Sequence, residues 1–227
     1  MKRILVIAAH PDDEVLGCGA TIAKYSRRGV EFAVLFIAEG SSCRYESPAC
    51  TDSTKAIEGR TRQALGALSL LGVKDYQFND LPCGRLDQVP IIEINKIIER
   101  FILTFNPDVV LTHSHLDVNN DHRVVYRATV MATRPTLKSH VGRILSYEVL
   151  SSSEWDYGET FLPNSFEQIE ERDIALKCQA MAAYETEVKD YPFPRSEQGI
   201  RTQAMSRGMQ AGVPLAEAFH LVREFRV

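Results

Sequence analysis

The chain has 227 residues, of which 44% are hydrophobic and 25% charged, and its formal net charge at pH 7 is −4. This length suffices for one domain with its own hydrophobic core, and the acidic balance without a Lys/Arg cluster argues against a nucleic-acid binder. The longest apolar runs are far shorter than the ~20 residues that a membrane span needs.

Strand and helix patterns alternate along the first two thirds of the chain. Strands are predicted at residues 3–9, 31–38, 75–78, 108–112 and 143–150, and helices at 15–28, 55–71, 91–105, 123–133 and 169–184. Apart from the helix predicted at 169–184, the last third is expected to be more irregular. The alternation predicts an α/β fold: a mostly parallel, Rossmann-like sheet with helices on both faces, forming a single domain over residues 1–227.

The N-terminus and the cysteines favour a reducing compartment. Met1-Lys2-Arg3 leads directly into the first strand without a long apolar segment or a cleavage site, so no signal peptide is evident. Five cysteines without repeated close spacing indicate free thiols rather than a disulfide framework. We therefore expect a cytoplasmic protein, and we expect Cys43 and Cys50, which share one polar loop, to be ordinary thiols.

The first candidate for chemistry follows the first strand. His10, Asp12, Asp13 and Glu14 stand together there, and ligands of parallel α/β sheets bind outside the carboxyl ends of the strands. A bound cation would offset the repulsion among these acids, and His with a carboxylate is a normal ligand set for zinc. The alternative is that Asp12 or Asp13 caps the next helix with Glu14 in its first turn. That alternative explains one acid, but not the histidine and two adjacent acids together.

A second polar cluster follows the strand predicted at 108–112. It contains half of the chain's six histidines and two acids: His113, His115, His122, Asp117 and Asp121. Structural zinc sites in short loops usually use cysteine, and this segment has none. Histidine and carboxylate ligands with room for water indicate a catalytic metal with an open coordination position.

Two motifs in this order resemble the LmbE/PIG-L family of metal-dependent N-deacetylases. They are AHPDDE at residues 9–14 and the pair DH at residues 121–122. The likeness extends to SSSEW at residues 151–155 and YPFPRS at residues 191–196, and thus over nearly the whole chain. The resemblance implies an LmbE-type fold.

The family's functional residues carry over to named positions of this chain. The resemblance implies that His10, Asp13 and His122 bind the metal, which would be Zn²⁺, with another divalent ion such as Fe²⁺ as the alternative. It also implies that Asp12 is the general base and that Asp121 supports catalysis from beside the last ligand.

The implied activity is hydrolysis of an acetamide. Water activated by the metal would attack the acetyl group of a small-molecule N-acetyl amino sugar or its conjugate, with Asp12 taking the proton. Two alternatives stay open: hydrolysis of an O-acetyl group or another amide at the same metal, or a non-catalytic sugar-binding protein. The sequence leaves a homo-oligomer open as well.

The chain departs from the family pattern at the proton donor. Asn119 stands where the family often has a histidine, and an amide donates a hydrogen bond but supplies no proton at neutral pH. We therefore expect Asn119 to stabilise the oxyanion, unless His113 or His115 fills the acid's place. His115 is also a candidate for substrate contact.

Two arginines are candidates for binding a substrate carboxylate or phosphate. Arg60 matches the arginine of the family's Arg-x-x-Glu motif, although Gln63 replaces the glutamate, and Arg195 lies in YPFPRS, where Phe193 stands at a position that is often histidine in relatives. A guanidinium binds such anions through a bidentate fork. The alternative for both arginines is a structural salt bridge.

Overall fold

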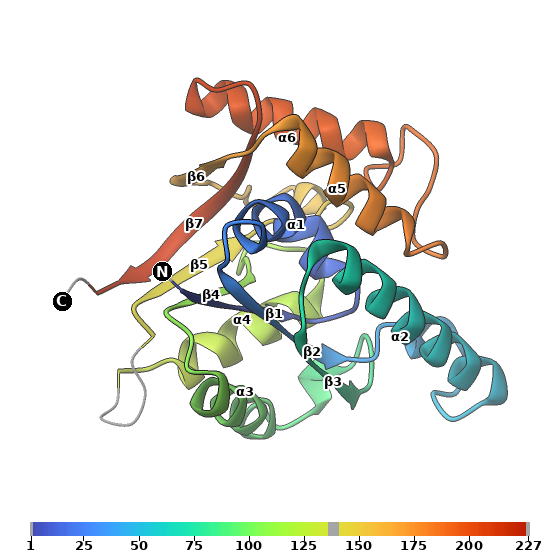
Figure 1. The fold of residues 1–227 in the computed structure, drawn as a ribbon. Helices are drawn as coiled ribbons and strands as arrows, with labels where there is room; N and C mark the ends of the chain where they lie inside the picture. Colours follow the sequence, from blue (N-terminus) through green and yellow to red (C-terminus); the bar gives the residue numbers. More distant parts are fainter. Residues whose placement is uncertain (1, 136–140, 226–227) are drawn as a thin grey trace.

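A computed structural model describes residues 2–135 and 141–225. Its strands are β1 (Arg3–Ala8), β2 (Glu31–Ala38), β3 (Asp75–Leu81), β4 (Val109–His113), β5 (Arg143–Tyr147), β6 (Ser165–Gln168) and β7 (Ala216–Glu224). They form a seven-stranded sheet in the order β3-β2-β1-β4-β5-β7-β6 (Figure 1). The first five strands pair in parallel, and β7 pairs antiparallel with both β5 and β6. The predicted α/β fold with a mostly parallel sheet is confirmed.

Helices cover both faces of the sheet (Figure 1). They are α1 (Asp13–Ser26), α2 (Thr51–Leu71), α3 (Ile91–Phe105), α4 (Asn120–Ala132), α5 (Glu171–Ala182) and α6 (Glu197–Ala211). Helices α1, α2, α5 and α6 enclose one apolar core, and α3 and α4 enclose the other. Within the described ranges, no helix combines the length and the apolar character needed to span a membrane.

The central strand β1 contributes to both cores. Ile4 and Val6 pack into the core beneath α1, whereas Leu5 and Ile7 pack into the core beneath α3. Successive strand residues point to opposite faces of a sheet, so a strand covered on both sides is apolar throughout. This explains why its sequence is a continuous run of hydrophobic residues.

The expectation of an irregular last third is wrong. That region holds β6, α6 and β7, which extend the sheet and cover its edge. Helix α6 buries only Ile200, Ala204 and Gly208, so its apolar stripe is narrow and consists mostly of small residues. A stripe of this kind produces almost no helical periodicity in the sequence.

The order of the strands creates a crevice between β1 and β4. From β1 the chain proceeds through α1 and α2 to β2 and β3 on one side, and then returns through α3 to β4 on the other side. Such a reversal of strand order separates the loops that leave the carboxyl ends of the two strands, and ligands bind there. The loops after β1 and β4 carry the two polar clusters.

Gly17 in α1 leaves space for the buried ring of Tyr147. A Cβ atom at Gly17 would lie 2.2 Å from Cδ2 of Tyr147, whose hydroxyl donates to the carbonyl of Ile7 at 2.9 Å. Gly17→Ala is expected to lower the free energy of unfolding in urea by about 1–3 kcal/mol, because the buried ring must shift. Gly59→Ala in α2 is the matched control, since its nearest neighbour would be 4.0 Å away, and it should cause no loss. Equal losses in the two variants would contradict this account.

Candidate functional site

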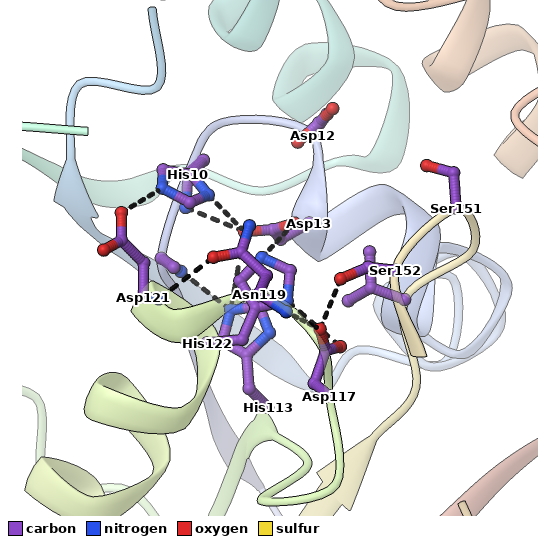
Figure 2. Close-up of polar contacts among 12 residues, drawn as sticks. His10, Asp12, Asp13, His113, Asp117, Asn119, Asp121, His122, Ser151 and Ser152 are labelled. Carbon is purple, nitrogen blue, oxygen red and sulfur yellow. Dashed lines mark hydrogen bonds and ion pairs between the residues drawn. The ribbon is translucent and has the colours of Figure 1, made fainter. Parts of the chain in front are cut away.

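The turn after β1 directs Asp12 and Asp13 to different places. Asp12 has a φ of 117°, in the left-handed region that non-glycine residues rarely adopt. It precedes α1, yet its side chain makes no capping hydrogen bond. The Asp13 carboxylate accepts the backbone N–H of His10 at 2.8 Å and points into the polar cluster, while Asp12 points away from it (Figure 2). Helix capping by Asp12 therefore does not explain this motif.

Asp13 lies between two histidine rings. One carboxylate oxygen is 3.4 Å from Nδ1 of His10, and the other is 3.4 Å from Nε2 of His122. Ligating atoms of the three buried residues all lie within 4.8 Å of one another. Two ligands at about 2.0–2.1 Å from a tetrahedral zinc ion are roughly 3.3 Å apart. The spacing and the donor types therefore fit a metal ion.

A carboxylate holds the outer nitrogen of His10. Nε2 of His10 is 2.8 Å from Oδ2 of Asp121 (Figure 2). The Asp121 carboxylate also accepts the backbone N–H groups of Gly84 at 2.6 Å and Leu86 at 3.0 Å. A carboxylate on the far nitrogen is the usual partner of a metal-binding histidine, because it fixes the ring's tautomer and orientation. Asp121 thus lies behind His10, whereas the sequence had associated it with the neighbouring His122.

The second histidine has an equivalent partner, which the sequence analysis did not assign. Nδ1 of His122 is 3.1 Å from Oδ2 of Asp117. Asp117 is fully buried and accepts the hydroxyl groups of Ser152 and Ser153, the latter at 2.7 Å. The SSSEW segment therefore orients His122 through Asp117. The position of Asp117 in the polar cluster after β4 was a signal that could have identified it.

These carboxylates control the charge of the metal-free site. Burial opposes protonation, but hydrogen bonds with Asp121 and Asp13 raise the pKa of His10 to about 9. Burial also opposes protonation of His122, but the Asp13 charge and the contact with Asp117 raise its pKa to about 10. Burial favours the neutral form of Asp13, but the charges of His122 and His113 lower the pKa of Asp13 well below its ordinary value.

Metal binding should consequently release protons. His10 and His122 carry protons at pH 7.5 in the metal-free protein, since their pKa values are about 9 and about 10, and both must lose them to bind a metal. Calorimetry with Zn²⁺ in buffers of different ionisation enthalpy should give about two protons released per ion at pH 7.5. The number of protons released per ion should fall as the pH rises through 9 and 10. Zinc binding without proton release at pH 7.5 would contradict these assignments.

His113 and His115 differ in their relation to the cluster. His113 is fully buried, its ring centroid is 4.0 Å from that of His122, and its Nε2 accepts the N–H of Ala9 at 2.8 Å. Burial, together with the charge of His122, lowers the pKa of His113 to about 3, so its ring is neutral at pH 7. His115 is exposed, with its ring centroid 5.2 Å from that of Tyr126. Proton donation by His113 is therefore disfavoured.

Asn119 is the N-cap of α4 and is drawn over His122 in the middle of the polar cluster (Figure 2). Its side-chain oxygen accepts the N–H of Asp121 at 2.9 Å. Because this capping bond uses the carbonyl oxygen, the NH₂ group is the part of Asn119 that can donate to a ligand. The geometry is compatible with the expected hydrogen-bonding role.

A second set of donors, His10, Cys83 and Asp121, also has ligating atoms within 4.8 Å of one another. Two of its donors have partners outside the set: Asp121 accepts the backbone N–H groups of Gly84 and Leu86, and the Cys83 thiol donates to Cys43 at a sulfur separation of 3.1 Å. Asp13 accepts one backbone N–H, that of His10, and directs both of its oxygens toward ring nitrogens. We therefore favour the set formed by His10, Asp13 and His122.

Asp12 is held by the two arginines that the sequence singled out. Nη1 of Arg195 lies 2.7 Å and Nη2 of Arg60 lies 3.5 Å from Oδ2 of Asp12. Both arginines also pair with the Glu187 carboxylate: Arg195 at 2.9 Å and Arg60 at 2.5 Å. The structure therefore contains the salt bridges weighed as the alternative for both arginines. Their contact with substrate stays a prediction.

Glu187 is the residue at this site that the sequence did not indicate. It is 4% exposed, and its carboxylate contacts Arg44, Arg60 and Arg195. It lies in no motif and belongs to the turn region after α5, so only the folded chain reveals it. Glu187 positions Asp12 through Arg60 and Arg195, which contact both carboxylates.

Glu187→Gln is expected to lower the free energy of unfolding by about 3–5 kcal/mol, because it removes the carboxylate closest to the buried Arg60 guanidinium. Urea denaturation would measure this loss. Glu31→Gln is the matched control, since the Arg3–Glu31 pair is exposed and such pairs contribute about 0–1 kcal/mol. A loss for Glu187→Gln no larger than that of the control would show that the cluster of arginines does not depend on this carboxylate.

A cavity adjoins this arginine cluster. Its volume is about 580 Å³, and its lining includes Ser41, Arg44, Tyr45, Lys55 and Arg60. The volume falls within the range of about 300–1,000 Å³ that is typical of small-molecule sites. Arg60 lines the cavity and also contacts Asp12, so the arginine cluster separates the cavity from that carboxylate by one side chain.

Comparison with known proteins connects these residues to a family. The family profile described as "PIG-L: GlcNAc-PI de-N-acetylase" matches residues 5–133, which contain both polar clusters. The chain is 30% identical over 192 residues to "Uncharacterized deacetylase YaiS" of Escherichia coli (strain K12), covering 82% of this chain and 91% of that protein.

Solved structures show the same fold. N,N'-diacetylchitobiose deacetylase from Pyrococcus horikoshii superposes with a TM-score of 0.78 at 23% identity, over 97% of this chain and 84% of that one. GalB, a 4-carboxy-2-hydroxymuconate hydratase from Pseudomonas putida, gives a TM-score of 0.74 at 20% identity, and the match covers 100% of this chain and 98% of that one. These two proteins are named for different reactions, so the shared fold alone does not identify the chemistry.

Proposed function

Because the chain belongs to the PIG-L (LmbE-like) family of deacetylases, we propose that it is a metal-dependent hydrolase that removes acetate from an N-acetylated amino sugar or its conjugate. The observation that carries the proposal is the placement of Asp13 between His10 and His122. The family's description names an N-acetylglucosamine conjugate, and the Pyrococcus enzyme is named for an N-acetylated disaccharide. Both names support an amino sugar as the substrate.

His10, Asp13 and His122 would hold one divalent ion, with Zn²⁺ as the first candidate and Fe²⁺ as the alternative. Two imidazoles and one carboxylate form a donor set that leaves a position open for substrate or water. When bound, the ion would polarise the acetamide carbonyl and lower the pKa of a water molecule to about 7. Asp121 and Asp117 would keep the two rings oriented through their outer nitrogens.

Asp12 would act as the base. Its carboxylate would accept a proton from the attacking water and then transfer it to the nitrogen of the departing amine. The ion pairs with Arg195 and Arg60 fix the direction of this carboxylate before the substrate arrives. This double use of one carboxylate requires no separate histidine acid, which agrees with the presence of Asn119 at that position.

Asn119 would stabilise the tetrahedral oxyanion through its NH₂ group. Loss of one such donor typically lowers the rate by about 10²–10³-fold. His115, exposed beside Tyr126, would contact the substrate at the rim. The cavity lined by Arg44, Lys55 and Arg60 would receive the remainder of the sugar conjugate.

An acetate-release assay on a panel of sugars tests this proposal. Purified, zinc-loaded protein should release acetate and a free amine in equal amounts from N-acetylated amino sugars, and O-acetylated sugars of the same skeleton should react far more slowly. Preferential cleavage of the O-acetyl substrates would favour the ester alternative. Tight sugar binding by metal-loaded protein without acetate release would favour the non-catalytic alternative.

A further inference from the structure

Cys43 and Cys83 bring two sulfur atoms together beside the candidate metal centre. The atoms are 3.1 Å apart although 40 positions separate the residues in sequence. Cys43 is exposed in a short 3-10 helix after β2 (Ser42–Arg44), and Cys83 is buried in the loop after β3. A disulfide bond is about 2.05 Å long, so the sulfur atoms would need to approach by only about 1 Å.

The backbones of the two cysteine loops share an anchor. The carboxylate of Glu39 accepts the backbone N–H groups of Ser41 at 2.6 Å and Ser42 at 2.9 Å, immediately before Cys43. It also accepts the N–H of Cys83 at 2.8 Å. Glu39 is 9% exposed and lies just beyond the end of β2. One buried carboxylate therefore holds both loops in the arrangement that places the thiols in contact.

We propose that Cys43 and Cys83 are a redox-active thiol pair that a peroxide oxidises to an intramolecular disulfide, thereby linking the two loops at the rim of the candidate metal centre. This proposal does not depend on the proposed deacetylase activity. The pair is not evident from the sequence, because Cys83 lies far from the loop that Cys43 shares with Cys50.

The reaction balances with hydrogen peroxide as the oxidant. The exposed Cys43 sulfur, as thiolate, attacks one peroxide oxygen; an S–O bond forms, the O–O bond breaks, and hydroxide leaves as water after protonation. The Cys83 sulfur, after losing its proton, then attacks the Cys43 sulfenic acid; the S–S bond forms, the S–O bond breaks, and a second water leaves. The two thiols lose two electrons and two protons in total, and the peroxide gains them.

The surroundings of Cys43 suit it to the first step. The hydrogen bond from the Cys83 thiol lowers the pKa of Cys43 to about 6, and the positive charge of Arg44 acts in the same direction. A thiolate rather than a thiol is the nucleophile in such reactions. Cys83 is shielded from solvent but within reach of Cys43, as a resolving cysteine should be.

The link would restrain residues that support His10. Gly84 and Leu86 donate their backbone N–H groups to Asp121, which contacts His10. Gly84 directly follows Cys83, so a disulfide would fix one end of this short loop. Hydrogen exchange at the amides of Gly84 and Leu86 should consequently be slower in the oxidised protein than in the reduced one.

Peptide mapping of the zinc-loaded full chain tests the proposal. After treatment with equimolar hydrogen peroxide and alkylation under denaturing conditions, a peptide pair linked through Cys43 and Cys83 should appear and should disappear with dithiothreitol. Cys50→Ser should leave this link unchanged. In the Cys83→Ser variant, oxidation should stop at a sulfenic acid on Cys43, and dimedone would trap that sulfenic acid.

Three outcomes would overturn the proposal. They are a Cys43–Cys50 link in the wild-type chain, oxidation of Cys43 beyond sulfenic acid while Cys83 stays alkylatable, and full alkylation of both thiols. Unchanged exchange at Gly84 and Leu86 in a fully linked sample would overturn the claimed restraint. The mapping uses the wild-type chain, so it remains decisive even where the Cys83→Ser variant fails to fold.

Discussion

Asp12→Asn is expected to lower kcat for acetate release by about 10²–10⁴-fold, the usual contribution of a positioned general base. The amide has nearly the same shape as the carboxylate, and asparagine is among the residues that tolerate a positive φ such as the 117° observed here. Because Asp12 points away from His10, Asp13 and His122, the bound zinc should stay at wild-type stoichiometry (Figure 2). Acetate assays and metal analysis on the same preparation would measure both quantities.

The control for this variant is Asp75→Asn, at the exposed start of β3, which should retain wild-type turnover. An Asp12→Asn enzyme with metal in place and turnover near the wild-type level would exclude Asp12 as the base. If activity and metal were lost together, Asp12 would belong to the metal site instead, and the proposed division of roles between the two adjacent aspartates would be wrong.

Removal of the metal is expected to lower the rate of acetate release at least as much as Asp12→Asn does. A strong chelator should reduce acetate release to background, and one equivalent of Zn²⁺ should restore it. His122→Ala should weaken zinc binding by about 100-fold or more, since even loss of a partner behind a ligand costs about 10–100-fold. Competition with a chelating dye would measure the affinity.

His220→Ala is the matched control for the loss of an imidazole. His220 lies on β7, where its Nδ1 contacts the carbonyl of Leu162 at 2.9 Å. That variant should bind zinc as the wild type does. Turnover that persists after complete metal removal, or normal zinc affinity in His122→Ala, would contradict the assigned metal site.

The sequence predicted the part of the fold that depends on strong local patterns. The strands at 31–38 and 3–9 are apolar throughout because helices cover both of their faces, and the prediction placed them within one residue of their bounds. The helix at 91–105 was predicted with its observed bounds because it carries a strong amphipathic stripe. The meeting of the two polar clusters was foreseeable because parallel strands bring their carboxyl ends to one edge of a sheet.

What the sequence could not provide are contacts between distant segments. Glu187 follows α5 and has no motif, yet it holds Arg60 of α2 in a buried ion pair. The pairing of Cys43 with Cys83 depends on the alignment of β2 with β3 and on the shared anchor at Glu39. Partners of this kind are chosen by tertiary packing, which leaves no periodic trace along the chain.

The most direct test of the central claim is an anomalous difference map from a crystal of the zinc-loaded protein, collected across the zinc absorption edge. We predict one strong peak bounded by Nδ1 of His10, the carboxylate of Asp13 and Nε2 of His122, with Asp117 and Asp121 behind the two rings. A peak bounded by His10, Cys83 and Asp121 would contradict the assignment and move the metal to the other side of His10.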